Sequence, residues 1–396
     1  MKPSKVSLVQ VKDYQQEHLN SGLKKGLNLL GGIQHIINPH SRVFVKINHL
    51  SPPSPPEKAI VTHPSFTREV LGILKSLSCH ITVGDDIQYK GKDRFHTSGY
   101  QKICDEMEVE LINLKEAGFR KIKCNGKHLK SIYISPPILE SDHVINLPKL
   151  KTHSFTIFTG AVKNMYGVIP YGLRLQYHKQ FSLPSEFSEM LVDIYSCVPP
   201  CLSIMDGINS MEGEGPSSGN PRKTNVILIS EDGVALDAVA SQIVGLDPIS
   251  VYSTQDAHQR GVGVGDLKKI QILGEEISRI KTRDFKHSAV AVGIIQRRIP
   301  QILHSFIQNQ LTFIPEVIPK KCTSCMECID ICPTAAAQIV NGKAWIEQNK
   351  CIHCMCCHEV CQFHAIKLKN QPMGLLIRKA SHWKQKISRL LRFQRD

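Results

Sequence analysis

Cys322-Thr-Ser-Cys325-Met-Glu-Cys328-Ile-Asp-Ile-Cys332-Pro333 is the stretch that decides how the C-terminal part of this chain folds. A second stretch repeats it, Cys351-Ile-His-Cys354-Met-Cys356-Cys357-His-Glu-Val-Cys361. Both copies have the spacing C-x-x-C-x-x-C-x-x-x-C. Three thiolates two residues apart in a tight loop can bind three irons of one cubane. The fourth cysteine, three residues further on, begins a helix that leads away from the loop, so it can reach a second cluster.

The doubled spacing resembles that of bacterial two-cluster ferredoxins, and the resemblance covers about Ile318 to Lys369. In that pattern the fourth cysteine of each copy binds the cluster of the other copy. Two 4Fe–4S clusters are therefore expected, one on Cys322, Cys325, Cys328 and Cys361 and the other on Cys332, Cys351, Cys354 and Cys357. Cys356 falls outside the pattern and is expected to bind no iron. Gln362 stands where a second proline would be usual.

Disulfides or zinc are the alternative uses of so many cysteines. A zinc site uses four ligands for one ion and does not require a doubled, interleaved set of eight. The spacing therefore favours iron–sulfur clusters over both alternatives.

The chain has 396 residues, enough for about two domains with a large buried core. A composition of 41% hydrophobic and 21% charged residues is that of a globular protein. Eight of the 14 cysteines are assigned to clusters, and the other six are scattered: Cys79, Cys104, Cys124, Cys197, Cys201 and Cys356. Scattered cysteines suit reduced thiols in a cytosol. Neither a signal peptide nor an apolar run of membrane-spanning length is apparent, so a cytoplasmic location is predicted.

The formal net charge is +14, and much of the surplus lies in the segments 279–321 and 378–395. A basic chain can bind nucleic acid, a membrane surface or an acidic protein. No zinc-finger, RNA-recognition or helix-turn-helix signature is present, so nucleic-acid binding is not expected. An acidic redox protein that docks on a basic rim is the preferred partner.

Strand and helix patterns alternate from the first residues to about Gly274. Strands are predicted over 5–11, 42–47, 80–83, 109–114, 143–147, 201–205 and 224–229, and helices over 17–30, 66–77, 99–107 and 234–244. This alternation predicts an α/β domain with a largely parallel sheet covered by helices on its faces. The cysteine repeats add a small α+β ferredoxin-like domain. In such sheets ligands gather beyond the carboxyl ends of the strands.

Several motifs of the α/β part resemble one family. They are Asn146-Leu-Pro-Lys-Leu-Lys-Thr-His153, Thr159-Gly-Ala-Val-Lys-Asn164 with Gly167, Asp206-Gly-Ile-Asn-Ser-Met-Glu-Gly-Glu-Gly-Pro216 with Gly219, and Ala235-Leu-Asp-Ala-Val-Ala240 followed by Gly245-Leu-Asp-Pro248. The family is the uncharacterised "domain of unknown function 362", which is often joined to a ferredoxin module. The resemblance covers nearly the whole chain to Gly274 and implies a fold and a site, but no reaction.

Cations follow the predicted strand ends and suggest an anionic ligand such as a carboxylate or phosphate. The candidate catalytic residues are Lys151, His153, Lys163, Asn164 and Asp206. The alternative for the lysines is that they solvate a surface helix. Asp237, early in a helix, is interpreted as a packing or cap residue.

Carboxylates at the same strand ends could hold a hard divalent cation or act as general acid and base. The candidate cofactor-binding residues are Asp85, Asp86, Glu212 and Glu214. Helix capping and turn chemistry in the glycine-rich loop Met211–Pro216 are the alternative. The loop lacks the GK[ST] ending of a phosphate-binding P-loop. Gly261-Val-Gly-Val-Gly265 follows no predicted strand, so it is not a dinucleotide fingerprint.

Four parts are predicted: an α/β domain over 1–274, a connector over 275–317, a two-cluster ferredoxin domain over 318–369 and a basic amphipathic tail over 370–396. The connector is expected to contain a strand over 284–294 and an amphipathic helix over 300–313. The tail has apolar residues at helical spacing between lysines and arginines. Such a helix can lie on an anionic membrane, although docking on protein is the preferred interpretation.

The leading hypothesis is an iron–sulfur oxidoreductase whose clusters pass single electrons to or from an anionic small molecule held by the α/β domain. A non-enzymatic electron carrier, in which the α/β domain docks a redox partner, is the first alternative. A redox-neutral isomerase or racemase with structural clusters is the second.

Overall fold

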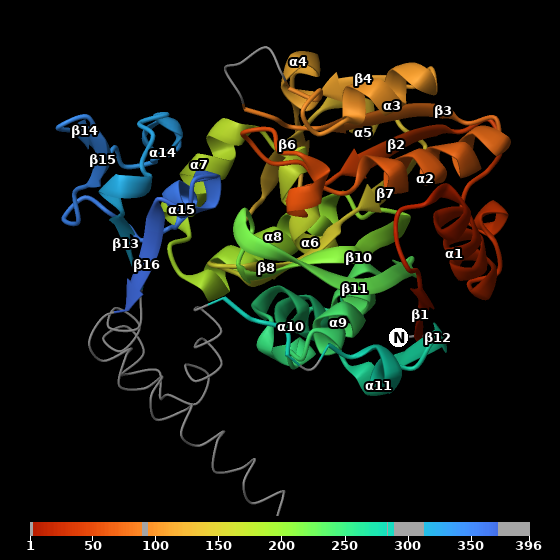
Figure 1. Ribbon diagram of the computed structural model, residues 1–396. Coiled ribbons are helices and arrows are strands. Elements are labelled where there is room, and N and C mark those ends of the chain that lie inside the picture. Colours follow the sequence, from red (N-terminus) through yellow and green to blue (C-terminus); the bar gives the residue numbers. More distant parts are fainter. Residues whose placement is uncertain (1–2, 89–93, 283, 289–312, 371–396) are drawn as a thin grey trace, which may run out of the picture. The chain divides into compact units, whose positions relative to one another are not determined.

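The chain folds as two units, Met1–Ser288 and Ala289–Asp396. A computed structural model describes residues 3–88, 94–282, 284–288 and 313–370 (Figure 1). We call the described part of the first unit the α/β unit and residues 313–370 the cysteine unit.

A ten-stranded sheet forms the centre of the α/β unit, in the order β12-β1-β11-β10-β7-β2-β3-β4, with β8 pairing with β10 and β9 pairing with β8. The strands are β1 (Ser4–Gln10), β2 (Arg42–Ile47), β3 (His80–Asp85), β4 (Glu110–Asn113), β7 (His143–Leu147), β8 (Lys149–His153), β9 (Ile157–Thr159), β10 (Leu202–Glu214), β11 (Ser218–Ser230) and β12 (Ile270–Gly274). β5 (Arg120–Lys123) and β6 (Ser131–Ile134) form a separate antiparallel pair.

Helices connect and cover these strands. They are α1 (Gln16–Leu29), α2 (Pro64–Ser76), α3 (Tyr100–Glu106), α4 (Leu114–Ala117), α5 (Pro136–Leu139), α6 (Ala161–Asn164), α7 (Tyr171–Gln180), α8 (Pro184–Cys197), α9 (Gly233–Ile243), α10 (Tyr252–Gln259) and α11 (Ile277–Ile280). Among the described residues, none of the helices is both long and apolar enough to cross a membrane.

Alternation along β2 shows why the sheet is covered on both faces. Val43, Val45 and Ile47 are buried in a cluster with the apolar faces of α1, α2 and α3. Phe44 belongs to a second cluster, which includes buried residues of α8. Lys46, which points to the same side as Phe44, is fully buried. Side chains of successive strand residues point to opposite faces, so β2 separates two hydrophobic layers.

The predicted fold class is confirmed: the sheet is mixed but mostly parallel, with helices on both faces. Parallel pairing joins β2 to β3 and β7, β3 to β4, β10 to β7 and β1 to β12. β11 is the main exception, because it runs antiparallel to both β1 and β10. The glycine-rich segment 211–219, expected as a loop, instead continues β10 and β11 into a long hairpin that turns at residues 215–217.

The cysteine unit consists of two strand pairs and two short helices. β13 (Phe313–Val317) pairs antiparallel with β16 (Ile366–Asn370), and β14 (Ala337–Val340) pairs antiparallel with β15 (Lys343–Ile346). The helices α14 (Glu327–Asp330) and α15 (Cys356–Val360) each begin one residue before the third cysteine of a repeat. Ala337, Ala344 and Ile346 contribute to its small core.

The unit boundary lies at Ser288/Ala289, whereas the predicted α/β domain ended at residue 274. Residues 275–282 include α11 and belong to the first unit, while β13, at the end of the predicted connector, pairs within the second. Residues 284–288 form no strand. The rest of the predicted connector strand, nearly all of the predicted 300–313 helix and the tail beyond residue 370 lie outside the described residues.

A disulfide joins Cys124 to Cys197, with Cα atoms 5.7 Å apart. The expectation that both are reduced thiols is therefore wrong. The 73-residue separation gave no framework spacing, but the fold packs both cysteines against one hydrophobic cluster.

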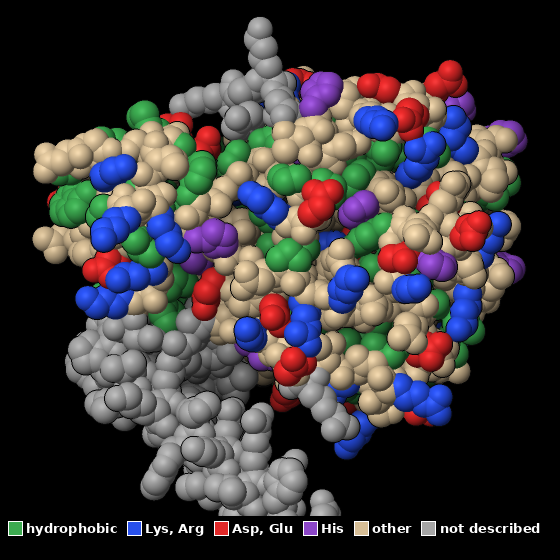
Figure 2. All heavy atoms as spheres, viewed as in Figure 1, with side chains coloured by type: hydrophobic (Ala, Val, Ile, Leu, Met, Phe, Trp, Pro, Cys, Tyr) green, Lys and Arg blue, Asp and Glu red, His purple; other side chains and the backbone are tan. Residues whose placement is uncertain are grey.

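On the face shown in Figure 2, lysine and arginine side chains are interspersed with aspartate and glutamate.

Candidate functional site: two cysteine-lined cavities and a buried polar network

Left-handed backbone positions curl both cysteine loops. Ser324 and Met326 have φ of 59° and 68° in the first repeat, and the equivalent His353 and Met355 have φ of 54° and 64° in the second. Residues other than glycine rarely adopt such angles, and where they do, the strain often marks a functional site. In each loop two such turns lie between the first and third cysteines, and all three of these cysteines line one cavity.

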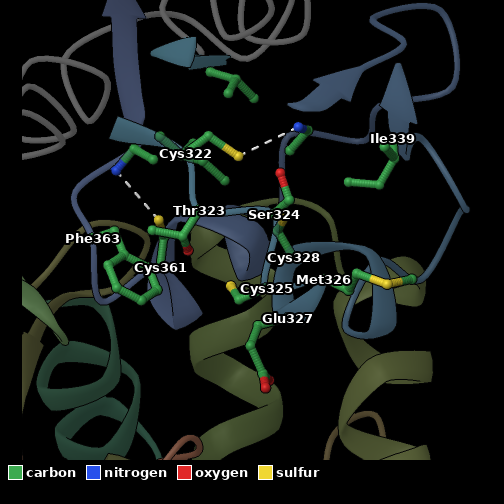
Figure 3. Close-up of a pocket in the computed structure, with 14 residues that line it drawn as sticks. Cys322, Thr323, Ser324, Cys325, Met326, Glu327, Cys328, Ile339, Cys361 and Phe363 are labelled. Carbon is green, nitrogen blue, oxygen red and sulfur yellow. Dashed lines mark hydrogen bonds between the residues drawn. The ribbon is translucent and has the colours of Figure 1, made fainter. Parts of the chain in front are cut away.

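The first cavity is lined by the sulfurs that the spacing grouped together. Its walls include Cys322, Cys325, Cys328 and Cys361. Figure 3 shows these four cysteines around the cavity, with Thr323 and Ser324 between the first two. Three come from one loop and the fourth from the end of the other repeat.

The second cavity repeats this arrangement. Its walls include Cys332, Cys351, Cys354 and Cys357. Cys356 also borders it, although the spacing assigns no iron to this residue. Cys356 aside, each cavity is thus lined by three cysteines of one loop and one cysteine of the other repeat. That these sets bind one cluster each stays a prediction.

Backbone amides donate to four of the sulfurs. The Ala344 and Ala365 N–H groups donate to the Sγ atoms of Cys322 and Cys361, at 3.4 and 3.3 Å (Figure 3). In the second set, His353 N–H donates to Cys351 Sγ at 3.4 Å and Ala336 N–H to Cys332 Sγ at 3.2 Å. Such donors stabilise thiolate ligands and tune the potential of an iron–sulfur cluster.

Crowding of the sulfurs calls for a cation between them. Burial, and then the neighbouring Cys325, Cys361 and Cys322, raise the pKa of the Cys328 thiol to about 12. Four thiolates cannot accumulate at such a site without a compensating positive charge. Bound iron would supply that charge, and its ligation would replace the thiol protons.

A single metal ion would need a different geometry. Among the described residues, no group of three or more His, Cys, Asp or Glu side chains is arranged to hold one ion. A cubane differs, because each of its four thiolates binds a separate iron. The two cavities and their donor sets therefore fit iron–sulfur clusters.

The hairpin β14–β15 borders both cavities with one face. Ile339 and its partner Ala344 line the first, and Ala337 and its partner Ile346 line the second. Residues two apart on a strand share a face, so one short hairpin separates the two sites.

In the α/β unit, Lys46 forms a buried ion pair with Asp85 at the carboxyl ends of β2 and β3. Lys46 Nζ lies 2.8 Å from Asp85 Oδ2, which also accepts from the His49 N–H at 2.9 Å. Burial lowers the pKa of Lys46 and raises that of Asp85, while each charge opposes the shift of the other. Gly167 fits against the pair, since a Cβ there would lie 2.5 Å from Asp85 Oδ1.

A second buried pair joins Lys149 to Asp206, 2.6 Å apart and fully enclosed. Tyr14 donates to Asp206 Oδ1 at 2.8 Å and accepts from Lys149 at 2.9 Å. The His63 N–H also donates to Asp206, and the His63 ring stacks on Tyr14 with centroids 3.7 Å apart. Burial lowers the pKa of His63 to about 4, so its imidazole is neutral at pH 7.

A family model and a relative both show to which family the α/β unit belongs. The model described as "Domain of unknown function (DUF362)" matches residues 43–242. A thylakoid-associated protein of Synechocystis sp. is 30% identical over 257 residues, which cover 64% of this chain and 78% of the relative. The chain belongs to the DUF362 family.

The cysteine unit matches a second model, described as "4Fe-4S binding domain", over residues 315–338. Together with the two cavities, this match makes the chain an iron–sulfur protein that carries a 4Fe–4S binding motif.

Two solved structures are also similar to the chain. The lactate racemase apoprotein from Thermoanaerobacterium thermosaccharolyticum has a TM-score of 0.43 at 11% identity, covering 62% of this chain and 58% of its own. A structural-genomics protein from Thermotoga maritima has a TM-score of 0.37 at 13% identity, covering 57% of each chain. This chain thus spans less than two thirds of either.

The DUF362 motifs meet in one polar network. Asn164 donates to Asn146 Oδ1 at 2.7 Å and accepts from Asn48 at 3.0 Å. Asp237 accepts from the N–H groups of Ala161 and Val162, so it caps the four-residue helix α6, as the sequence suggested. Motifs distant in the sequence therefore hold one another in place.

The remaining predicted cationic residues occupy separate places. Lys151 is buried and donates to the Ile60 carbonyl at 2.7 Å. His153 is buried, and its Nδ1 accepts from the Phe155 N–H. Lys163 lies 5.6 Å from the centre of the Tyr166 ring.

The four predicted cofactor-binding carboxylates are held by different groups. Asp85 pairs with Lys46, while Asp86 accepts from Arg174 at 2.7 Å. Glu212 accepts from the Lys286 N–H at 3.1 Å, and Glu214 from Ser154 at 3.4 Å. A divalent cation on these residues stays a prediction.

Sequence analysis missed three polar residues: Tyr14 and His63, which contact Asp206, and Arg174, which pairs with Asp86. Tyr14 precedes α1 and His63 caps α2, so neither follows a parallel strand where polar residues were sought. His63-Pro64 before an apolar helix was the available signal, since it marks a helix start.

Proposed function

We propose that this chain binds two 4Fe–4S clusters and transfers single electrons between protein partners. The observation that carries the proposal is the pair of cavities, each bordered by the four cysteines that the interleaved spacing assigns to one cluster. All-cysteine cubanes are one-electron carriers. The Sγ atoms would bind iron, and the four amide donors would stabilise the added negative charge on reduction.

Iron analysis of anaerobically prepared protein tests the proposal. About eight irons per chain and the EPR signal of reduced cubanes are expected from two clusters. Cys361→Ser should lower the iron content to about half, because Cys361 is the only ligand that its repeat supplies to the first cluster. Cys356→Ala is the matched control and should keep all the iron.

Four irons in the unmodified protein, or zinc in place of iron, would defeat the proposal. Iron lost from Cys356→Ala and kept by Cys361→Ser would show that the ligands are wrongly assigned.

A reductase that acts on a small ligand in the α/β unit is the second candidate. The observation in its favour is the contact of Tyr14 and His63 with the buried Lys149–Asp206 pair. These side chains can donate and accept protons, and because Tyr14 and His63 are only half-buried, a ligand could reach them. An anionic ligand would have to compete with Asp206 for Lys149 and with Asp85 for Lys46. The existing pairs therefore favour electron transfer between proteins over the predicted anion-binding enzyme.

Titration of the cluster-loaded protein with small carboxylates and phosphates, followed by calorimetry, separates the two candidates. Binding that Lys149→Met abolishes, with iron content unchanged, would favour the reductase. The redox-neutral isomerase gains no support from these contacts.

Cellular location belongs to the same proposal. We place the protein in the cytoplasm as a peripheral electron carrier, while its Synechocystis relative is named as thylakoid-associated. Fractionation of cells decides between these locations: recovery in the membrane fraction that high salt does not release would contradict the cytoplasmic placement.

A further inference from the structure

The two cysteine repeats differ in what they expose. In the first repeat Cys325 is exposed and Met326 is 49% exposed. Their equivalents in the second repeat, Cys354 and Met355, are both buried, with Met355 only 3% exposed. The loop of the first cluster site therefore reaches the protein surface, whereas that of the second does not.

Large apolar side chains surround the exposed loop. Met326, Ile339 and Phe363 all line the first cavity and are 49%, 39% and 46% exposed. Figure 3 shows Phe363 on one side of the sulfurs and Met326 and Ile339 on the other. Of the six exposed large apolar side chains among the described residues, only Tyr133 lies outside the cysteine unit. A gathering of this kind marks an interaction surface.

Lysines border this apolar rim, which we define as Met326, Ile339 and Phe363. Lys320 and Lys321 directly precede Cys322 and are exposed. Lys343, also exposed, donates to the Cys322 carbonyl at 2.7 Å. Glu327 is the one carboxylate that lines the first cavity. An apolar centre with a cationic border fits a partner whose own apolar patch has an acidic border.

We propose that the apolar rim and its three lysines form the docking surface for an acidic protein that carries one electron at a time. This inference rests on the proposed electron transfer and names its point of entry, the first cluster. In the step itself the partner loses one electron and the first cluster gains it, and no bond forms or breaks. Contact through Met326 and Phe363 shortens the path to the exposed Cys325.

Stopped-flow reduction of the full, cluster-loaded chain tests the proposal. The protein donor is a purified acidic flavodoxin in its hydroquinone form, which gives one electron and becomes the semiquinone. The small donor is a photoreduced deazaflavin, which needs no docking surface. Met326→Glu and Phe363→Glu should each slow reduction by flavodoxin about tenfold, because a rim carboxylate repels an acidic partner. Both should leave reduction by deazaflavin within about twofold of the unmodified protein.

Trp345→Glu is the matched control. Trp345 is 48% exposed on the same hairpin, but β15 alternates, so it points away from the face that borders the cavities. Lys343 starts on this outer face too, but its side chain reaches back to the Cys322 carbonyl beside the first cavity, which is why only Trp345 serves as the control. It should change neither rate by more than about twofold. Raising the salt concentration should slow the flavodoxin reaction of the unmodified protein, because salt screens the lysines.

Equal slowing by the rim variants and Trp345→Glu would overturn the proposal, as would a flavodoxin rate that the rim variants leave unchanged or that salt does not lower. Slowing with both donors would also overturn it, because the changes would then act on the cluster itself. If deazaflavin cannot reduce the unmodified protein, the proposed electron transfer fails instead.

Discussion

The two units hold their reactive side chains in opposite ways. In the α/β unit each buried lysine of the strand ends already has a protein partner: Lys46 pairs with Asp85 and Lys149 with Asp206. In the cysteine unit the sulfurs face one another across cavities, so like groups are gathered without an opposite charge between them. The first arrangement already pairs opposite charges within the chain, whereas the second gathers donors of one kind that fit an iron–sulfur cluster. Reactive side chains alone therefore do not mark a ligand site, but several like donors that line one cavity do.

Removing iron should give the largest effect, and it tests most directly whether the two units differ in their need for a metal. The small core of the cysteine unit is built around its sulfurs, so chelation should unfold residues 313–370 and leave the α/β unit folded. Limited proteolysis with mass spectrometry measures this, with the iron-loaded chain as control. Equal protection of both units after chelation would contradict the expectation.

Breaking the Lys149–Asp206 pair should give the next largest effect, a loss in the free energy of unfolding. Lys149→Met leaves a buried carboxylate without its cation, which should lower the free energy of unfolding by about 3–5 kcal/mol. The double change Lys149→Met/Asp206→Leu should restore most of that loss, because no charge then stays buried. Anaerobic urea unfolding measures both, with the exposed Lys24→Met as control. A double variant as unstable as the single one would show that the pair is not the cause.

Adding one carbon at Gly160 tests how tightly the DUF362 motifs pack. A Cβ there would lie 2.0 Å from Asp237 Oδ1, so Gly160→Ala should lower the free energy of unfolding by roughly 1–3 kcal/mol. The control is Gly172→Ala in α7, where a Cβ would meet nothing within 4 Å. That change should raise stability slightly, because alanine favours a helix. Equal effects at the two glycines would refute the packing argument.

The pH dependence of Asp237 should give the smallest effect. Burial raises the pKa of Asp237 to about 7, although the hydrogen bonds from the Ala161 and Val162 N–H groups act to lower it. The folded state therefore holds a proton that the unfolded state releases near pH 4, and stability falls as pH rises toward 7. Between pH 6 and 7 the loss should be about 1 kcal/mol. Urea unfolding at pH 5 to 8 measures it, and Asp237→Asn should remove this slope. An unchanged slope in the variant would assign it to another group.

The grouping of cysteines around two cavities could be predicted because its signal is local. Spacing within each repeat determines which thiols share a loop, and the three residues before each fourth cysteine carry it away from that loop. The periodic strands were equally accessible: β2 and β7 begin and end where the sequence places them. The limits of these strands depend on residues that are close in sequence, so the hydrophobic pattern of the sequence is enough to predict them.

The polar network of the α/β unit could be predicted only in part. The predicted strand over 201–205 ended before Asp206, whereas Asp206 lies inside β10, which continues to Glu214. Its contacts with Tyr14 and His63 could not be predicted, because they join segments 192 and 143 residues away. The Cys124–Cys197 bond was missed for the same reason. The glycines of 211–219 suggested a loop because glycine is rare in strands, whereas close packing against Thr152 and Met211 explains Gly215 and Gly219.

The face of the β14–β15 hairpin has a final consequence for spectroscopy. Its two cavity-lining pairs are two residues apart, so the walls of the sites are separated by about 7 Å along the strand. Clusters bound beside this one hairpin would be close enough for their unpaired spins to interact. A sample reduced at both sites should then give a broadened EPR spectrum, whereas a sample reduced at one site should not.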